Sequence, residues 1–260
     1  MMKFSFVIPC YNEREGIPKL FEALEDARQT LGPTYEWELV FVDDGSVDGT
    51  AKLLWEAFRG HPNVQVIRHA SNRGLGAALR TGFEHATGDL IATADSDCTY
   101  DPREVGAMLR LIEQGADIVV ASQYHPYGRV KNVPAYRLLL SRNLSHLYRW
   151  VLGSELYTYT GLFRLYRTEV LRTIRFKSDG FLAVAELLVE ALLRGYRVVE
   201  YPTQLTVREY GQSKAVISRL VIDHLRFLWQ LARRRSRLSS RATTTGGRVA
   251  TEQTTPATKC

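Results

Sequence analysis

The first 120 residues alternate between short runs rich in β-branched and aromatic residues and longer stretches with helical spacing of apolar positions. Short apolar runs bounded by turn residues predict buried strands, and apolar residues recurring every three or four positions predict helices. The predicted strands are residues 3–8, 36–44, 64–69, 89–95 and 116–122. The predicted helices are residues 15–31, 48–60, 74–87 and 102–114. This alternation predicts an α/β fold with a mostly parallel, Rossmann-like sheet flanked by helices.

The second half of the chain loses this regular alternation. The polar segment HPYGRVKNVPAYR reads as a loop, residues 135–152 as a basic amphipathic helix, and YTGLFRLYRTEVL as a strand followed by a helix. A helix over residues 181–194 and a strand over residues 196–202 follow. We expect these elements to complete the same sheet and its helical layers.

The C-terminal region predicts an amphipathic helix followed by a tail. Over residues 215–235 the apolar positions form a stripe on one side of the predicted helix. The opposite side carries Arg219, Asp223, Arg226 and Arg233. From residue 236 the chain is Ser, Thr, Arg and Gly with few apolar side chains, which predicts disorder. The expected organisation is therefore a main domain over residues 1–214, a basic helix over 215–235 and a disordered tail over 236–260. The apolar stripe consists of Ile217, Leu220, Val221, Leu225, Leu228 and Leu231.

The excess positive charge of the chain is concentrated in its C-terminal region. The formal net charge is +6, and the segment from Arg219 to Arg241 holds seven arginines against one acid, Asp223. The remainder is close to neutral. This distribution favours contact with an anionic membrane surface at the C-terminal region over nucleic acid wrapped around the whole protein. Packing of this helix on the main domain, with its arginines solvated, is the alternative.

Membrane and redox features place further limits. The apolar start of the chain is too short for a signal peptide, and no apolar run approaches the roughly 18 residues that span a bilayer. The three cysteines are odd in number and widely spaced, which suits neither a disulfide framework nor a zinc site. We therefore expect a cytoplasmic protein that is peripheral on the cytoplasmic face of a membrane.

Four polar motifs follow the first four predicted strands. They are PCYNE, DDGSVDGT, SNRGLGAA and DSD, in chain order. The carboxyl ends of parallel strands meet at one edge of a sheet, where ligands bind in α/β proteins. Turn and cap chemistry explains any one of these motifs, but four at the same edge indicate a binding site.

The segment TADSDCTYDP crowds three carboxylates behind a buried strand. Like charges at this spacing repel unless a cation lies among them. Asp95 and Asp97 can reach one point if the backbone turns, and two hard oxygen ligands suit Mg²⁺ or Mn²⁺ bound jointly with a diphosphate. Asp101 precedes Pro102 and is instead expected to cap the following helix.

A dinucleotide-binding motif is the competing interpretation of NRGLGAAL. Gly74 and Gly76 fit its first two glycines, and Asp95 follows about twenty residues later. However, Leu79 stands at the third glycine position and the motif follows the third strand, not the first. A helix start that needs a tight turn, with room for a phosphate, explains it better.

The motifs VIPCYNE, VDDGSVDGT, NRGLGAALRTGF, ADSD and REYGQSK, in this order, resemble the family-2 inverting glycosyltransferases of GT-A fold. Within that family the chain is most similar to the dolichol-phosphate mannose synthase-like, or polyprenyl-phosphate glycosyltransferase, group. The resemblance covers roughly residues 3–230. It implies that residues 1–214 form a GT-A catalytic domain that moves a hexose, with inversion, from a GDP-mannose or UDP-glucose type donor to a polyprenyl or dolichyl phosphate.

The resemblance also implies roles for individual residues. Asp95 and Asp97 resemble the metal-binding pair, and Thr99 stands where a third ligand, often Gln, occurs. The residues expected to close over the diphosphate and the acceptor phosphate are Arg208 and Lys214, whose planar fork and mobile charge suit phosphate oxygens. Catalysis is thus assigned to Asp97, Arg208 and Lys214. The residues that resemble donor-binding positions are Pro9, Tyr11, Glu13, Asp44 and Asp95, with Asp43 supporting the turn.

The acceptor side departs from the family pattern. Ser122-Gln123 replaces a frequent Ser-Arg and removes a phosphate-binding arginine. Arg137, in AYRLLLSRN with Ser141, resembles an acceptor-phosphate residue that can compensate. A lipid phosphate is an anionic nucleophile at neutral pH, so no strong base is needed. A hydroxyl acceptor would need one, and Glu186, set among apolar residues, is the candidate.

Two other interpretations remain distinct from the lipid-phosphate enzyme. The same donor chemistry can serve a hydroxyl acceptor on a glycan or small molecule. A nonenzymatic nucleotide- or nucleic-acid-binding protein explains the basic tail but leaves Asp95 and Asp97 as repulsive charges facing the ligand. We expect no nucleic-acid partner, and the sequence leaves the oligomeric state open.

Overall fold

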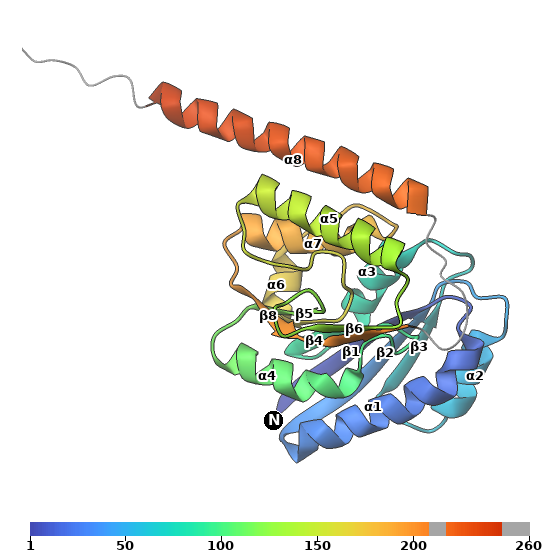
Figure 1. Ribbon diagram of the computed structural model, residues 1–260. Helices are drawn as coiled ribbons and strands as arrows, with labels where there is room; N and C mark the ends of the chain where they lie inside the picture. The colour runs from blue at the N-terminus through green and yellow to red at the C-terminus, as the bar shows by residue number, and fades with distance from the viewer. Residues whose placement is uncertain (208–216, 246–260) are drawn as a thin grey trace, which may run out of the picture.

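A seven-stranded sheet forms the centre of the protein (Figure 1). The computed structural model describes residues 1–207 and 217–245. The order of the strands is β3-β2-β1-β4-β7-β5-β8, and β6 and β9 form a separate parallel pair. The strands are β1 (Met2–Cys10), β2 (Tyr35–Asp43), β3 (Val64–Arg68), β4 (Leu90–Thr93), β5 (Ile118–Ser122), β6 (Arg129–Lys131), β7 (Arg164–Arg167), β8 (Val198–Pro202) and β9 (Gln204–Thr206).

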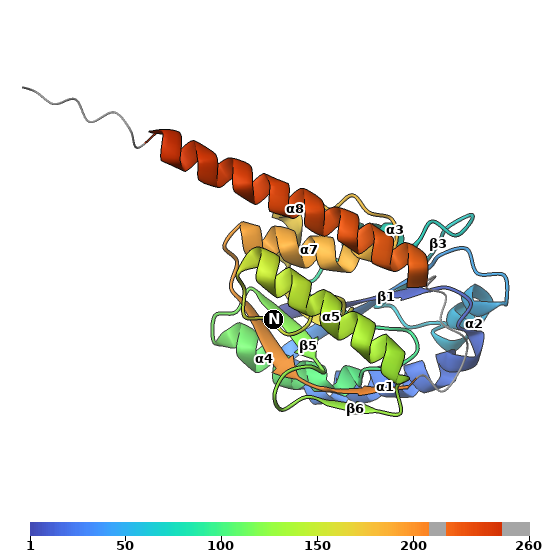
Figure 2. The ribbon, with the colours of Figure 1, turned by 45° about the horizontal axis from the view of Figure 1, so that its top comes forward.

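Helices cover both faces of this sheet. In Figures 1 and 2, α1, α2 and α4 lie on one face, and α3, α5, α6, α7 and α8 lie on the other. The α-helices are α1 (Ile17–Leu31), α2 (Thr50–Ala57), α3 (Leu75–His85), α4 (Val105–Glu113), α5 (Ala135–Leu152), α6 (Thr168–Thr173), α7 (Leu182–Leu193) and α8 (Ile217–Thr245). Short 3₁₀ turns occupy Arg14–Gly16, Gly32–Thr34 and Pro102–Glu104. The α/β architecture predicted from the sequence is confirmed.

Strand β7 is antiparallel to both of its neighbours, β4 and β5. The chain leaves β5, passes through β6 and α5, and returns to insert β7 between β4 and β5. Arg164 at the start of β7 therefore pairs with Thr93 at the end of β4. The loop that enters β7 consequently lies at the edge where the parallel strands end, which adds a segment to the site.

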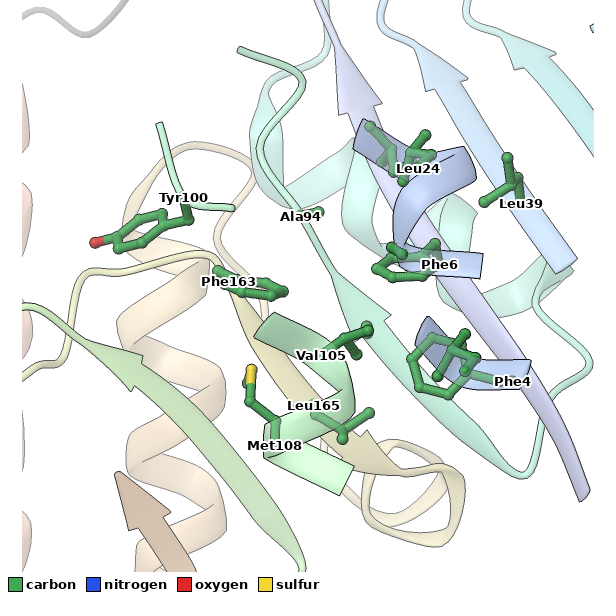
Figure 3. Packing of buried hydrophobic residues seen from close by; sticks show 14 of the residues in the cluster. Phe4, Phe6, Leu24, Leu39, Ala94, Tyr100, Val105, Met108, Phe163 and Leu165 are labelled. Atoms are coloured by element: carbon green, nitrogen blue, oxygen red, sulfur yellow. The ribbon is translucent and has the colours of Figure 1, made fainter. Parts of the chain in front are cut away.

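The core on the α1, α2 and α4 face is built from side chains of β1, β2, β4 and β7. Phe4 and Phe6 stack edge to face with ring centroids 5.0 Å apart, a favourable aromatic geometry. In Figure 3 the ring of Tyr100 lies next to Phe163 at one end of this cluster, and its hydroxyl group points away from it. That hydroxyl donates a hydrogen bond to Oε1 of Gln123, at 2.9 Å. The core thus reaches directly to the edge of the sheet.

Among the differences between predicted and observed boundaries, two concern the strand-end carboxylates and the C-terminal helix. Strand β4 ends at Thr93, so Asp95 belongs to the following loop, and Asp101 caps the next turn by accepting the N–H of Arg103. Helix α8 continues to Thr245, so residues 236–245 extend the helix that was expected to end before them. They contain no Gly or Pro, and the first helix breaker is Gly246. The remainder of the expected tail, residues 246–260, lies outside the described residues.

Helix α8 packs on the main domain along α5 and α7. Leu228 and Leu231 are buried, as the predicted apolar stripe requires, whereas Leu225 lies on the exposed side. His224 is also buried, and its Nδ1 lies 2.7 Å from the hydroxyl of Tyr148 on α5. Over residues 1–207 and 217–245, no helix has both the length and the apolar character needed to cross a bilayer.

Burial of His224 makes the stability of the fold depend on pH. Its pKa is lowered to about 4 because burial disfavours the charged ring, although Asp223 acts in the opposite direction. The unfolded chain therefore binds more protons between pH 6.5 and pH 4, and the free energy of unfolding falls as pH falls through this range. The slope contributed by one group is at most about 1.4 kcal/mol per pH unit.

We expect His224→Asn, which can still accept from Tyr148, to lose less stability than the parent protein between pH 7 and pH 5. Urea unfolding at both pH values measures this difference and cancels the contributions of other titrating groups. Equal losses for the two proteins would contradict it.

Candidate active site

Two cavities lie on either side of Asp95 and Asp97. The first has a volume of about 430 Å³ and lies at the carboxyl ends of β1, β2 and β4. The second has a volume of about 300 Å³ and lies between β9, α5, α8 and the loop that enters β7. The residues that line both cavities are Leu75, Asp95, Asp97, Leu162 and Phe181. The six residues that the sequence placed together and that line the first cavity are Pro9, Tyr11, Glu13, Asp44, Asp95 and Asp97.

Asp44 ties together the loops that form one wall of the first cavity. Its carboxylate accepts the backbone N–H groups of Arg73 and Gly74, at 2.9 and 2.7 Å. The same carboxylate lies 2.6 Å from Nδ1 of His69. Gly45 follows at φ +74°, and a Cβ there would lie 2.4 Å from the backbone of Ser71. The end of β2 is thereby fixed against the start of α3.

Asp43 lies behind the cavity and not on its surface. It is fully buried, accepts the N–H of Ser46 at 3.3 Å, and has Oδ2 at 3.2 Å from Nε of Arg68. Arg68 in turn donates to the carbonyl of Ser46. This is the turn-supporting position that the sequence indicated, without direct access to a ligand in the first cavity.

The loop after β1 is held by the loop after β2. The N–H of Asn12 donates to Ser46, the N–H of Glu13 donates to Thr50, and that of Arg14 donates to Asp48. Burial acts to raise the pKa of Asp48, but hydrogen bonds from Thr50 and Arg14 outweigh it and lower the pKa. Asp48 thus accepts from both Arg14 and the hydroxyl of Thr50, and Thr50 in turn accepts the N–H of Glu13 at the cavity.

A tight turn gathers the carboxylates of the third loop. The N–H of Cys98 contacts the carbonyl of Asp95 at 3.4 Å, and Cys98 itself has φ +51°. The N–H of Thr99 donates to Oδ1 of Asp97 at 3.1 Å. The turn lets Asp95 and Asp97 face the same two cavities, as the spacing predicted. Neither segment of the described chain contains a cluster of three or more His, Cys, Asp or Glu side chains of the kind that holds a metal alone.

The donor set still fits a hard divalent cation. Mg²⁺ is commonly held by one or two carboxylates together with phosphate oxygens, which Asp95 and Asp97 can provide. Burial and the charge of Asp97 raise the pKa of the Cys98 thiol to about 12, so this thiol is protonated in the metal-free protein at neutral pH. Thr99 lines only the second cavity, and its carbonyl accepts from Thr206. Its role as a third ligand stays a prediction.

The second cavity combines one guanidinium with apolar walls. Arg137 and Ser141 of α5 line it, and the hydroxyl of Ser141 lies 3.0 Å from that of Thr160. Arg137 is exposed and lies over the ring of Tyr136, with its Nε donating to the hydroxyl of that residue at 3.2 Å. The apolar lining consists of Leu75, Val133, Pro134, Leu138, Leu162, Phe181, Val184, Leu205, Val207 and Leu220.

Several residues at this cavity had no signal in the sequence. Gln123 lines it and is oriented by Tyr100, although Gln123 was noted only as the replacement of an arginine. Arg164 is fully buried behind it and donates to the carbonyls of Tyr159 and Val184. His224 comes from α8 and Phe181 from the residue before α7. Their convergence depends on the insertion of β7 and the docking of α8, which the local pattern does not specify.

Glu186 lies outside both cavities. Its carboxylate accepts the N–H groups of Lys177 and Ser178, at 3.0 and 2.9 Å. This placement contradicts the expectation that it acts as a base or contacts the acceptor. Apolar neighbours in the sequence suggested an apolar environment, but the carboxylate accepts hydrogen bonds from two backbone N–H groups.

The glycines at the start of α3 allow residues 178–179 to pack closely against this helix start. The carbonyl of Asp179 accepts the N–H groups of Gly76 and Ala77, at 2.6 and 3.3 Å. A Cβ on Gly76 would lie 2.1 Å from the carbonyl oxygen of Ser178. These N–H groups therefore bind a protein carbonyl, and the phosphate expected at this helix start has no such place here. Arg208 and Lys214 lie outside the described residues, and their roles stay predictions.

Comparison with known proteins identifies the family. The model of Glycosyl transferase family 2 matches residues 5–175. The chain is 33% identical over 234 residues to a dolichol-phosphate mannosyltransferase of Pyrococcus furiosus, covering 88% of this chain and 64% of that protein. It is 35% identical over 215 residues to a polyprenol monophosphomannose synthase of Mycolicibacterium smegmatis, covering 80% of this chain and 79% of that protein.

This chain belongs to glycosyl transferase family 2. It spans just under two thirds of the length of the Pyrococcus relative. The fold is similar to that of glucosyl-3-phosphoglycerate synthase from Mycobacterium tuberculosis, solved with Mn²⁺, UDP and glucosyl-3-phosphoglycerate. The TM-score is 0.64 at 21% identity, over 87% of this chain and 80% of that one. The resemblance drawn from the sequence motifs is therefore confirmed, and so is the expected GT-A-like fold.

The placement of Glu186 in this family-2 chain yields a test. In Glu186→Gln one of the two backbone N–H groups of residues 177–178 loses its acceptor, so we expect a loss of stability of about 1–2 kcal/mol. Sugar transfer should fall less than tenfold, with an unchanged pH profile. Urea unfolding and a pH–rate profile measure the two effects. A fall of about 100-fold or more, of the size expected for a lost general base, would contradict this assignment.

Proposed function

We propose that this protein transfers mannose, with inversion, from a nucleotide-activated donor to a polyprenyl phosphate. The observation that carries the proposal is the pair of cavities that meet at Asp95 and Asp97. A cavity of about 430 Å³ that Tyr11, Glu13 and Asp44 line adjoins a second cavity with a cationic residue and apolar walls, which suits a phosphate attached to a hydrocarbon chain. The names of the two mannose-transferring relatives favour this sugar and this acceptor class.

On the donor side, Asp95 and Asp97 would hold Mg²⁺ or Mn²⁺ together with the diphosphate. The ion would supply positive charge to the departing nucleoside diphosphate. Tyr11, Glu13 and Asp44 would surround the nucleoside, in loops held rigidly by the hydrogen bonds described above. Arg208 and Lys214 are proposed to add positive charge from the late loop. The similar fold of the mycobacterial synthase is compatible with such a donor complex.

On the acceptor side, a phosphate oxygen would attack the anomeric carbon. A phosphate monoester has a second pKa near 6, so this nucleophile is already anionic at neutral pH. Arg137 would bind and orient it, and the polar edge made by Gln123 and Ser141 would complete the contacts. The tasks left to the protein are alignment of the two reactants and exclusion of water.

The hydroxyl-acceptor alternative is less well supported by the described residues. Such an acceptor needs a general base within hydrogen-bond reach. Among the described residues that line the second cavity, the carboxylates are Asp95 and Asp97, which are proposed to hold the cation. His224 also lines it, but its lowered pKa makes it a weak base. Glu186 lies elsewhere, so the acceptor that requires no base fits better.

Asp97→Asn tests the cation site while keeping Oδ1 as an acceptor for the N–H of Thr99. We expect transfer to fall about 100-fold or more, the size of effect seen when charge stabilisation at a reacting centre is lost. We also expect Mg²⁺ to stop improving the affinity for nucleoside diphosphate, measured by calorimetry with and without the ion. Asp101→Asn is the matched control, since it should keep its cap and its activity. Unchanged transfer by Asp97→Asn would overturn the assignment.

Arg137 distinguishes a phosphate acceptor from other acceptors. We expect Arg137→Ala to raise the KM for a short, water-soluble prenyl phosphate about tenfold or more, and Arg137→Lys to recover part of this loss. The KM for the sugar nucleotide should not change. Arg142→Ala, on the same helix but outside the cavity lining, is the control. Steady-state kinetics with both substrates varied measure the effects, and an unchanged acceptor KM would contradict the role.

A further inference from the structure

A third cavity lies between α3, α6 and β4, and its described lining residues differ from those of the first two cavities. Its volume is about 710 Å³, compared with about 430 Å³ for the first cavity. Ile91 of β4 and Ile174 directly after α6 line it and are buried, so the cavity reaches from the surface of the protein to the sheet. This volume is in the range of cavities that bind small organic molecules.

The described residues that line the third cavity include three arginines and one carboxylate, that of Glu84. Arg80 belongs to α3, Arg172 to α6 and Arg175 to the segment after α6. Arg175 is exposed and donates to the carbonyls of Arg172 and Ile174, at 3.2 and 3.3 Å. The exposed side chain of Arg172 makes no hydrogen bond or ion pair within the part of the chain that the structure describes. Since like charges repel, three guanidinium groups at one cavity indicate an anionic ligand.

The chemistry of the lining indicates a phosphate that is joined to an apolar body. A guanidinium presents a planar fork that binds two phosphate oxygens at once. A phosphate monoester carries more negative charge at neutral pH than a carboxylate, so it matches three guanidinium groups better. The apolar residues that would contact the rest of the ligand are Phe83, Ala86, Ile91, Leu171, Ile174 and Phe176.

Arg80 connects the third cavity with the active site. Its guanidinium carbon lies 5.2 Å from the ring centroid of Phe176, and the group donates to the carbonyl of Ser178 at 3.0 Å and to the carboxylate of Asp179. The carbonyl of Asp179 accepts N–H groups at the start of α3, and Phe181, two residues further along, lines both cavities of the active site.

The ion pair between Arg80 and Asp179 is one that a ligand can displace. The two side chains are 31% and 66% exposed, and an exposed pair of this kind contributes little to stability. A phosphate bound at Arg80 would compete with the carboxylate of Asp179 for the same guanidinium group. The segment before α7, which carries Phe181, would then be held less firmly.

We infer that the third cavity is a second ligand site, which binds a small soluble phosphate with an apolar body and acts on the active site through Arg80. The inference goes beyond the proposed function, because neither the donor nor the acceptor is proposed to contact these residues. Binding at the third cavity draws Arg80 away from Asp179, loosens the segment before α7 and slows sugar transfer.

Calorimetry with naphthyl phosphate as the probe tests the site. The titration uses full-length Arg137→Ala protein with metal ions chelated, so that neither a cation at Asp97 nor Arg137 in the second cavity holds the probe. We expect saturable binding that weakens about tenfold or more when Arg172→Ala and Arg175→Ala are added. Inorganic phosphate should bind about threefold or more weakly than naphthyl phosphate, because it leaves the apolar lining without a partner.

The matched control is the pair Arg59→Ala and Arg110→Ala, which removes the same charge from the opposite face of the sheet. Arg59 follows α2, Arg110 belongs to α4, and both are exposed. This pair should leave the affinity for naphthyl phosphate unchanged within about twofold, since surface charges far from a site are screened. If circular dichroism shows the variant at 172 and 175 to be unfolded, Arg172→Ala is measured alone.

Four results would overturn the site. They are absence of saturable binding, equal weakening by the control pair, equal affinity for inorganic phosphate, and displacement of the probe by phosphatidylglycerol vesicles. The last result would assign the cavity to a lipid headgroup in place of a soluble phosphate.

Transfer kinetics test the connection through Arg80. With Arg137 intact, naphthyl phosphate should slow transfer to a short prenyl phosphate about threefold or more even at saturating acceptor, and the variant at 172 and 175 should lose this effect. Inhibition that excess acceptor removes completely in both proteins would overturn the connection. If the parent protein transfers no sugar, the proposed function is contradicted, and the calorimetry still decides whether the third cavity binds a phosphate.

Discussion

The geometry of the site depends on the hydrogen bonds that the carboxylate of Asp44 accepts. It accepts two backbone N–H groups at the start of α3 and contacts His69. The helix start that it fixes then binds the carbonyl of Asp179, and the neighbouring residues 177–178 are held by Glu186 of α7. A continuous set of hydrogen bonds thus runs from β2 to α7 and positions Phe181 between the two cavities. Buried hydrogen bonds to charged groups of this kind are stronger than neutral ones and leave little freedom for the loops.

Negative charge at the edge of the sheet has a structural cause and a chemical use. Parallel strands end together, so Asp44, Asp95 and Asp97 are brought to one place by the topology. Hydrogen bonds with the backbone stabilise Asp44, whereas Asp95 and Asp97 lie where two cavities meet. The cost of placing two like charges side by side is reduced when a cation and a diphosphate are bound together, which ties donor binding to the same two residues.

Helices α5 and α8 each have one side that lines the second cavity and another side that is exposed. Helix α5 directs Arg137 and Ser141 toward the second cavity while Leu139 and Trp150 face outward, and α8 repeats this division with His224 and Trp229. A helix can do this because residues on opposite faces are separated by its diameter, roughly 10 Å. The same elements therefore line the second cavity and expose apolar side chains on their outer sides.

The sequence by itself determined the sheet, the strand-end motifs and the family, because each is recorded in local periodicity or in turn residues at fixed offsets. It placed Asp95 and Asp97 together and assigned Asp101 to a cap, since a turn directly after a strand and the capping of a helix are short-range effects. The prediction that Glu186 lies at the acceptor was wrong. Its apolar neighbours in the chain do not reveal that its carboxylate accepts hydrogen bonds from the backbone of residues 177–178. Only the tertiary structure decided that β7 inserts between β4 and β5 and that α5 turns its leucines outward. Both depend on contacts between residues far apart in the chain, which no local pattern specifies.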